Sequence, residues 1–279
     1  MQELDELRRL LANTTQRFTH YQNLPPSLLC KYGYDLLGEY TPEQLSLDAS
    51  RLKFLEKHVG LQGLKVTEIG SNLGFFCLQL AETHQAVVTG FEPIESYARA
   101  STLMARLLSL PEENCQFISS GVTLSNISFI DNCDLAIELN VMHHAGSLFD
   151  CEVVENSGGW LQYATKRLAA IREKARYLYF QTGNMRNGKP LFASEDSIEV
   201  VSKILDDSGW SVDTVGMLKD LSTYNLDYES YLMSDIDEIP RYQCRRNPQT
   251  DKVEYLNLQT SSKTFLATGL GNRPLWICS

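Results

Sequence analysis

From Leu64 onward, short apolar runs alternate with helix-like segments, and this rhythm constrains the fold more than any other feature of the chain. The apolar runs are residues 64–69, 86–91, 115–119, 133–139 and 175–181. Helix-like segments separate them near residues 75–82, 94–110 and 161–174. The runs lack the alternation of polar and apolar residues that marks a strand with one face in water. Strands of this kind, joined through helices, predict a mostly parallel sheet covered on both faces, which is a doubly wound α/β fold.

The later part of the chain extends this pattern and then interrupts it. An amphipathic helix is expected over residues 194–207, a strand over residues 210–215 and a closing strand over residues 274–278. Residues 219–263 lack a clear period and are rich in tyrosine, aspartate and arginine. Such a long stretch inside a compact domain indicates local structure of its own or a role in covering a substrate.

The first 60 residues have helical character. Leu4, Leu7 and Leu11 recur at helical spacing, and the pair Pro25-Pro26 breaks that pattern. A helix-start signal follows in the stretch Thr41-Pro42-Glu43-Gln44, with a capping residue, a proline and a partner for a capping box. A further apolar stripe consists of Leu52, Leu55 and Val59 and ends at Gly60.

These patterns predict four segments. Residues 1–60 form an N-terminal helical lid, and residues 61–218 form the catalytic core. Residues 219–263 form an insertion that covers the site, and residues 264–279 supply the final strand or strands of the core sheet.

Composition places the chain among ordinary globular proteins, with 43% hydrophobic and 22% charged residues out of 279. No apolar run approaches the roughly 20 residues that span a bilayer. The N-terminus also lacks the basic start and apolar middle of a signal peptide, so a cytoplasmic location is expected. The seven cysteines form no Cys-x-x-Cys pair and are predicted to be reduced residues of the core.

The formal net charge of −10 argues against non-specific coating of nucleic acid, because phosphate contacts need a basic surface. The dense basic cluster Arg241, Arg245 and Arg246 is interpreted as a solvated face, although a local patch of this kind can also hold RNA.

A strand, a glycine-containing turn and a helix start occupy Val66 to Phe76. Gly70 and Gly74 let the backbone turn tightly and approach a ligand. Their Gly-x-x-x-Gly spacing differs from the Gly-x-Gly-x-x-Gly of dinucleotide enzymes. Glu68, just before the turn, would repel a pyrophosphate. It suits a ligand with positive charge, such as the sulfonium and amino groups of S-adenosylmethionine.

A second acidic residue, Glu92, ends the next apolar run in the sequence Val88-Thr89-Gly90-Phe91-Glu92-Pro93. A carboxylate at this position can accept hydrogen bonds from both ribose hydroxyls, as the acidic residue of related nucleotide folds does. The turn and Glu92 together predict a nucleoside site in the first two β/α units.

With these motifs, the sequence resembles class I S-adenosylmethionine-dependent methyltransferases over about residues 60–218 and the final strand. Glu68-x-Gly70-x-x-x-Gly74 is similar to their first motif, although Asn72 stands where many members have a third glycine. A similar Gly-x-Asn-x-Gly-Phe turn followed by Phe-Glu-Pro is found in methyltransferases of the FkbM type. The stretch from Asp134 to His144 and the closing Arg273-Pro274-Leu275-Trp276 most resemble bacterial methyltransferases that cap O-antigen polysaccharide.

The resemblance implies a set of residues that bind S-adenosylmethionine. They are Glu68, Gly70, Ser71, Asn72, Gly74, Phe75, Glu92, Pro93, Ser120, Gly121, Glu138, Leu139 and Asn140. Among them, Ser120 and Gly121 are expected near the adenine, and residues 138–140 near the methionine end.

His143 and His144, just past the fourth strand, are the candidate general bases, because histidine suits proton abstraction near neutral pH. Adjacent helical residues point about 100° apart, so one ring is expected to face the cleft. A purely structural role, in capping a helix or bonding a loop carbonyl, is the alternative. A metal site of Glu138, His143 and His144 is a further alternative, although their spacing does not bring all three onto one helical face.

The predicted function is O-methylation of a hydroxyl on a sugar, glycan or small metabolite. The alternatives are a nucleic-acid (tRNA) modifying methyltransferase or carboxymethyl-transferase of the same fold, and a non-catalytic subunit. The acidic charge disfavours the nucleic-acid enzyme. The presence of Glu68, both loop glycines and Glu92 disfavours the non-catalytic subunit.

Overall fold

The computed structural model describes residues 2–13, 22–33, 47–186, 189–191, 197–218, 227–246, 253–257, 259–260, 263–266 and 273–279. The chain divides into two compact units. The first consists of Met1–Leu52, Val59–Val122 and Cys133–Ile137, and the second of Lys53–His58, Thr123–Asn132 and Glu138–Ser279.

The first unit is built on parallel strands in the order β3-β2-β1-β4. Their bounds are β1 (Lys65–Ile69), β2 (Val87–Phe91), β3 (Cys115–Ile118) and β4 (Cys133–Leu139), and the last two residues of β4 belong to the second unit. The chain moves outward from β1 through β2 to β3 and then returns to the other side of β1. With right-handed crossovers, this reversal of direction puts helices on opposite faces, as the sequence predicts for a doubly wound fold.

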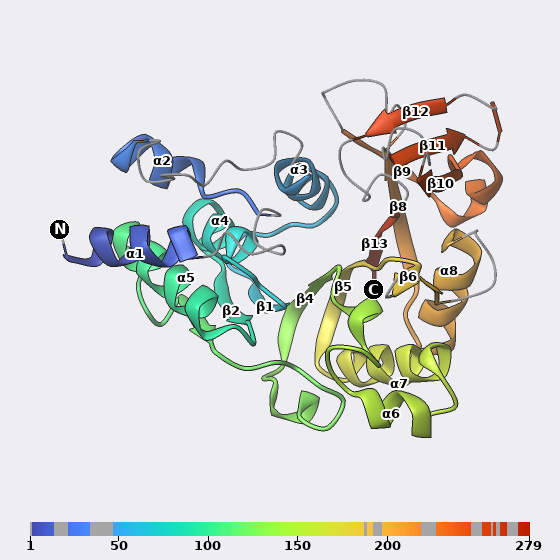
Figure 1. Ribbon diagram of the computed structural model, residues 1–279, viewed down its shortest axis with the longest axis horizontal. Helices are drawn as coiled ribbons and strands as arrows, with labels where there is room; N and C mark the ends of the chain where they lie inside the picture. Colours follow the sequence, from blue (N-terminus) through green and yellow to red (C-terminus); the bar gives the residue numbers. More distant parts are fainter. Residues whose placement is uncertain are drawn as a thin grey trace. The chain divides into compact units, whose positions relative to one another are not determined.

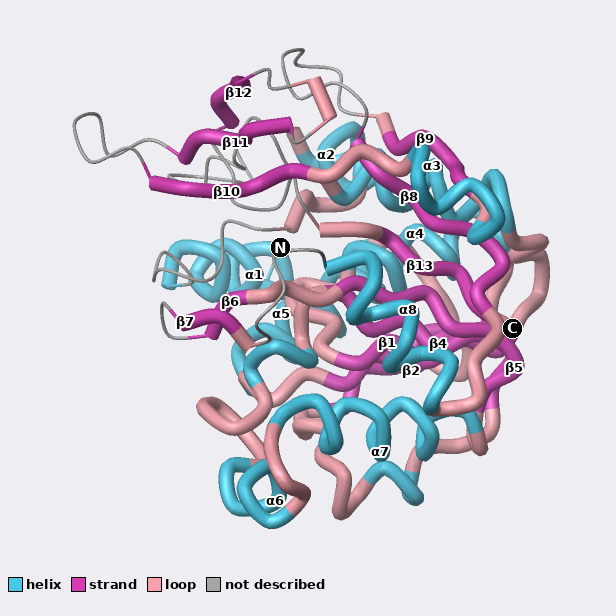
Figure 2. Tube along the Cα trace, turned by 90° about the vertical axis from the view of Figure 1, so that its right-hand side faces the viewer, coloured by secondary structure: helices cyan, strands magenta, loops and turns pink. Residues whose placement is uncertain are grey.

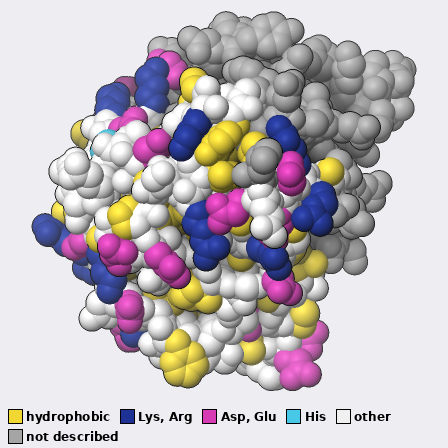
Figure 3. All heavy atoms as spheres, turned by 90° about the vertical axis from the view of Figure 1, so that its left-hand side faces the viewer, with side chains coloured by type: hydrophobic (Ala, Val, Ile, Leu, Met, Phe, Trp, Pro, Cys, Tyr) yellow, Lys and Arg dark blue, Asp and Glu magenta, His cyan; other side chains and the backbone are white. Residues whose placement is uncertain are grey.

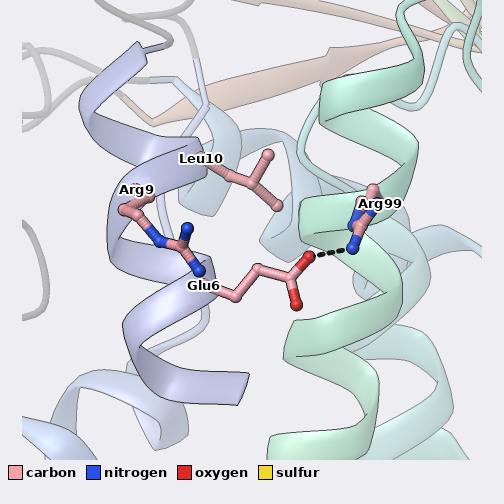
Figure 4. A pocket seen from close by; sticks show the side chains of 4 residues that line it. All are labelled: Glu6, Arg9, Leu10 and Arg99. Carbon is pink, nitrogen blue, oxygen red and sulfur yellow. Dashed lines mark ion pairs between the residues drawn. The ribbon is translucent and has the colours of Figure 1, made fainter. Parts of the chain in front are cut away.

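Figure 1 shows the helices that precede and separate these strands. They are α1 (Gln2–Asn13), α2 (Pro26–Tyr32), α3 (Asp48–His58), α4 (Phe75–His84) and α5 (Glu95–Leu107). Helix α4 packs against all three strands β1, β2 and β3, and α5 packs against β3. Helix α1 lies along α5, where Leu7 and Leu11 are fully buried and Glu6 forms an ion pair with Arg99 (Figure 4).

In the second unit, the strand order continues from β4 as β5-β13-β8-β9. The bounds are β5 (Ala175–Gln181), β8 (Val212–Leu218), β9 (Tyr228–Tyr231) and β13 (Leu275–Cys278). Strand β13 is antiparallel to both β5 and β8. The helices are α6 (Cys151–Asn156), α7 (Trp160–Arg172) and α8 (Ser197–Asp207), and α7 packs on β5 while α8 packs on β8.

The stretch predicted as an insertion contains structure of its own where it is described. It supplies β9, the 3₁₀-helix η4 (Met233–Glu238) and two strands of an antiparallel three-stranded sheet, whose third strand lies mostly in the segment predicted to complete the core sheet. The strands of that sheet are β10 (Tyr242–Arg246), β11 (Val253–Asn257) and β12 (Lys263–Leu266), side by side in Figure 2. The remaining short elements are η2 (Ile127–Phe129), η3 (Met142–His144) and the hairpin of β6 (Met185–Arg186) and β7 (Lys189–Pro190).

The predicted strands and core helices are confirmed to within a few residues. The stripe of Leu52, Leu55 and Val59 is buried, as its spacing indicates. The helix start at Thr41 lies outside the described residues, and the division into lid, core and insertion stays a prediction. None of the helices in the described ranges has both the length and the apolar character needed to cross a membrane.

Two details differ from the predictions. Pro25-Pro26 ends one pattern but also starts helix α2, because a proline with fixed φ suits the first helical position. The cysteines are not all core residues. Cys77, Cys115 and Cys278 are buried, whereas Cys30 and Cys151 are exposed on the short helices α2 and α6.

Candidate functional site

The turn after β1 is tied to the end of β2. The backbone N–H groups of Gly70 and Ser71 both donate to the carbonyl of Phe91, at 2.8 and 3.0 Å. Gly74 (φ 74°) precedes the first residue of α4, and its N–H donates to the carbonyl of Ser71 at 2.7 Å. A Cβ at Gly74 would lie 2.6 Å from the ring of Phe117, so glycine is required there for space as well as for conformation.

Asn72 accounts for the missing third glycine of the motif. Its φ of 50° lies in the left-handed region, which glycine adopts freely and asparagine tolerates better than most residues. Its side-chain oxygen accepts a hydrogen bond from the N–H of Leu73 at 2.8 Å. The departure from the family pattern therefore keeps a backbone conformation that a glycine would adopt.

The carboxylate of Glu92 is held in place by two backbone N–H groups. Its carboxylate is 5% exposed, and its two oxygens accept N–H bonds from Asn72 at 2.9 Å and Ile94 at 3.0 Å. Burial raises the pKa of Glu92, and the two N–H donors oppose that rise. Each oxygen keeps a further acceptor position, which suits a pair of neighbouring hydroxyls.

The loop after β3 lies beside Glu92. The N–H of Glu92 donates to the carbonyl of Ile118 at 3.0 Å, and Ser120 and Gly121 follow directly. A Cβ at Gly121 would be 3.5 Å from the Cβ of Pro93. The first unit thus brings together the predicted residues of the Gly70–Gly74 turn, of Glu92-Pro93 and of Ser120-Gly121.

Glu68, the acidic residue before the turn, points toward α4 in the structure. Its side chain is buried and accepts hydrogen bonds from the N–H and the Sγ–H of Cys77 on α4, at 3.3 and 3.0 Å. Burial raises the pKa of Glu68 to about 8, and Cys77 opposes the rise. The raised pKa favours the protonated acid at neutral pH, and the role of Glu68 toward a cationic ligand stays a prediction.

Two further polar groups lie near the turn: Gln22, which no sequence pattern indicates, and Ser71, which is one of the predicted cofactor-binding residues. The Oε1 of Gln22 accepts from the N–H of Phe75 at 3.3 Å, at the start of α4. The hydroxyl of Ser71 is completely buried and has no hydrogen-bond partner among the described residues. Gln22 belongs to the segment before Pro25-Pro26, and no local pattern links it to α4.

In the second unit, Asn140, Gln181 and Arg273 form a closed hydrogen-bonded ring. Asn140 Nδ2 donates to Gln181 Oε1 at 3.0 Å, and Gln181 Nε2 donates to the carbonyl of Arg273 at 2.8 Å. Arg273 Nη1 donates to Asn140 Oδ1 at 2.6 Å. Asn140 was predicted as a site residue, whereas Gln181 was not, and Arg273 entered only as part of the closing motif.

His143 and His144 lie next to this ring, on the 3₁₀-turn η3. Their ring centroids lie 4.0 Å apart with the planes tilted by 37°, so the two imidazoles lie against each other and do not diverge as the helical spacing predicts.

The two histidines differ in accessibility. His143 is 6% exposed, and its Nδ1 lies 3.5 Å from the N–H of Gly183. Burial, then Arg273 and His144, lower the pKa of His143 to about 2. His144 is half-buried, and its pKa is lowered by burial and by Arg273. The lowered pKa values favour neutral rings at pH 7, and His144 is the more exposed of the two.

Glu138 pairs with an arginine in the structure. Its carboxyl is fully buried and pairs with the equally buried Arg167 of α7, with 3.3 Å between Oε1 and Nε. The described residues contain no group of three His, Cys, Asp or Glu side chains arranged to hold a metal ion. Oε1 of Glu138 pairs with Arg167, whereas its buried Oε2 has no hydrogen-bond partner among the described residues, so the metal site of Glu138, His143 and His144 stays a hypothesis. Leu139 is half-buried between Glu138 and Asn140.

No protein-family model and no curated protein matches the sequence. Among solved structures, the chain is similar to magnesium protoporphyrin IX methyltransferase (ChlM) from Synechocystis PCC 6803 with bound SAM, at 17% identity and a TM-score of 0.48. The match covers 82% of this chain and 95% of that one. WbdD matches at 15% identity and a TM-score of 0.49, over 89% and 52% of the two chains.

A SAM-dependent methyltransferase from Aquifex aeolicus matches at 20% identity and a TM-score of 0.44, over 70% of this chain and 93% of that one. Likenesses below 25% identity and a TM-score of 0.5 carry no argument about function. The function has to be argued from the residues of this chain.

Proposed function

We propose that this chain is an S-adenosylmethionine-dependent O-methyltransferase whose acceptor is a hydroxyl of a sugar, glycan or small metabolite. The observation that carries the proposal is the carboxylate of Glu92. Glu92 directly follows β2 and lies beside the Gly70–Gly74 turn, and its carboxylate accepts hydrogen bonds from the N–H groups of Asn72 and Ile94.

The residues of the first unit fit a nucleoside. The Glu92 oxygens keep acceptor positions for a ribose diol. Ser120 and Gly121, beside Pro93, are the residues we assign to the adenine. The buried hydroxyl of Ser71, which has no partner among the described residues, is a further group that a polar ligand could satisfy.

A dinucleotide enzyme is the main competitor on fold grounds. Dinucleotide folds continue with parallel strands in the order 3-2-1-4-5-6. In this chain, β13 is instead inserted antiparallel between β5 and β8. The turn also lacks the Gly-x-Gly-x-x-Gly spacing. Both features favour the methyltransferase.

Bound S-adenosylmethionine would supply an electrophilic methyl group. The chain has to align an acceptor hydroxyl and take its proton. We assign proton removal to His144, because it is half-buried and because burial and Arg273 lower its pKa, which favours the neutral ring. His143 is more deeply buried and stacks on it, so we assign His143 to the orientation of His144.

The remaining assignments complete the proposal. Residues 1–60 act as a lid, and residues 219–263 cover the acceptor. Asn140 and Leu139 contact the methionine end of the cofactor, whereas Glu138 acts through Arg167 and not on the ligand. The partners are small molecules or glycans, and the enzyme works in the cytoplasm.

Titration calorimetry with S-adenosylmethionine and S-adenosylhomocysteine tests the cofactor assignment. Wild type should bind both, and Glu92→Gln should bind about tenfold or more weakly, since hydrogen bonds to a charged group contribute about 1.5–3 kcal/mol each. Glu95→Gln, on the exposed first turn of α5, is the matched control and should bind as wild type does. Absence of heat with wild type would overturn the proposal.

Methyl transfer to a panel of sugars and small hydroxylated metabolites tests the base. His144→Ala should lower kcat about 10²-fold or more, which is the range of general-base catalysis, while cofactor affinity stays unchanged. Full activity in His144→Ala would show that another group takes the proton.

A further inference from the structure

Arg273 precedes β13 and is held in place by hydrogen bonds of its backbone carbonyl and of its guanidinium. Its carbonyl accepts from Gln181 Nε2 at 2.8 Å, and its Nη1 donates to Asn140 Oδ1 at 2.6 Å. Asn140 is itself fixed, because its N–H donates to the carbonyl of Gln181 at 2.7 Å. The guanidinium therefore has a defined position at the ends of β4 and β5.

Gly183 provides the surface on which this guanidinium rests. A Cβ at Gly183 would lie 2.9 Å from both Cζ and Nη2 of Arg273 and 3.1 Å from its Nε. Gly183 is not among the glycines with positive φ, so it is needed for space and not for an unusual backbone conformation. On its N–H side, Gly183 lies 3.5 Å from Nδ1 of His143.

The charge of Arg273 acts on both histidines. For His143 the charged or titratable groups that contribute are Arg273 and His144, and for His144 the contributing group is Arg273. Both interactions lower the pKa of the imidazole, in the same direction as burial. Glu138, the carboxylate on the neighbouring strand, is paired with Arg167.

We propose that Arg273 is a positioning residue that keeps the His143–His144 pair in its neutral, proton-accepting form, and that Gly183 is glycine in order to seat its guanidinium. This inference rests on the proposed function for its catalytic meaning. An imidazolium cannot take a proton from a hydroxyl, so a fixed cation beside the pair extends the base toward lower pH.

The test is an NMR titration of the histidine ring signals in the full chain without cofactor. In Arg273→Gln, the pKa values of His143 and His144 should rise, because a cation has been removed, but should stay below that of an exposed histidine, because burial remains. Arg273→Lys keeps the charge and should restore much of the depression. Unchanged titration in Arg273→Gln would overturn the proposal.

Gly183→Ala tests the seat of the guanidinium without changing any charge. The added methyl group must displace Arg273, so the histidine pKa values should rise here as well. Gly60→Ala is the matched control, because a Cβ there meets nothing within 4 Å. If Arg273→Gln does not fold, Gly183→Ala alone tests the proposal. Histidine pKa values in Gly183→Ala that equal those of wild type would then refute it.

Activity adds a second readout. The acid limb of the kcat profile against pH should move to higher pH in Arg273→Gln, with kcat above that limb largely kept. A uniform loss of kcat at every pH, with the limb in place, would contradict the proposed role. The titration needs no cofactor, so its result can be interpreted even if the protein is not a methyltransferase.

Discussion

Asn72 carries a left-handed backbone at a position where related motifs have glycine. We predict that Asn72→Gly keeps stability within a few tenths of a kcal/mol and keeps cofactor affinity. Asn72→Val should lose about 1–2 kcal/mol more than Asn72→Gly, since a β-branched residue is strained in this region. Urea denaturation of the two variants measures the difference. Both lose the side-chain bond to Leu73, so equal midpoints would rule out strain as the cause.

Glu68 is predicted to make stability depend on pH. Its pKa is about 8 in the folded chain against 4.5 when exposed. Between these values the folded state keeps a proton that the unfolded state releases, so the free energy of unfolding falls as pH rises through this window. Glu68→Gln, which has no proton to lose, should equal wild type at pH 4 and exceed it at pH 8.5 by on the order of a few kcal/mol.

Denaturant unfolding of wild type and Glu68→Gln at several pH values makes this measurement. The exposed Glu113→Gln is the control and should follow wild type at every pH. A constant difference between Glu68→Gln and wild type from pH 4 to pH 8.5 would show that Glu68 is ionised in the folded chain.

Sequence reasoning recovered part of the candidate site. Gly70, Gly74 and Glu92 were identified because turn glycines and a strand-ending acid leave a local signal. Partners that are distant in sequence leave none. Arg273 meets Asn140 across 133 positions, and Gln22 meets Phe75 across 53. The inward orientation of Glu68 also depends on α4, which the local motif does not reveal.

At the scale of elements, hydrophobic periodicity predicted the buried strands and helices well. It worked because strands buried on both faces read as continuous apolar runs. It failed where burial is partial. The short helix α6, the 3₁₀-turn that carries His143 and His144, and strands β9 to β12 have no sustained period, and their form depends on tertiary contacts.

The pair of Arg167 on α7 and Glu138 on β4 makes a prediction about helix docking. Both side chains are fully buried. Arg167→Met alone leaves a buried carboxyl without its cation and should cost about 3–5 kcal/mol, whereas Arg167→Met with Glu138→Leu should recover most of that loss. Denaturant unfolding measures both variants.

Lys166→Met, one residue away on the exposed side of α7, is the control and should stay within about 0.5 kcal/mol of wild type. If the double variant were no more stable than Arg167→Met, the loss would come from packing, including the contact of Arg167 with the ring of Phe149, and not from an uncompensated charge.

For the whole molecule, charge separates the two enzyme hypotheses. The chain carries a net charge of −10, and acidic and basic side chains are interspersed on the face in Figure 3. Ion pairs between α1 and α5, such as Arg106 with Glu3, neutralise basic groups on these helices. A surface of this kind lacks the continuous positive field that attracts a phosphate backbone.

We therefore predict that the protein forms no complex with tRNA in a gel-shift assay, even at about 50 mM salt, where phosphate contacts are strongest. It should still transfer methyl groups to small hydroxylated acceptors. The prediction would be contradicted by a tRNA complex that weakens steeply with salt and is lost when Arg241, Arg245 and Arg246 are all replaced by glutamine. That outcome would move the assignment to a nucleic-acid-modifying enzyme, because phosphate binding would then depend on the dense basic cluster of the sequence.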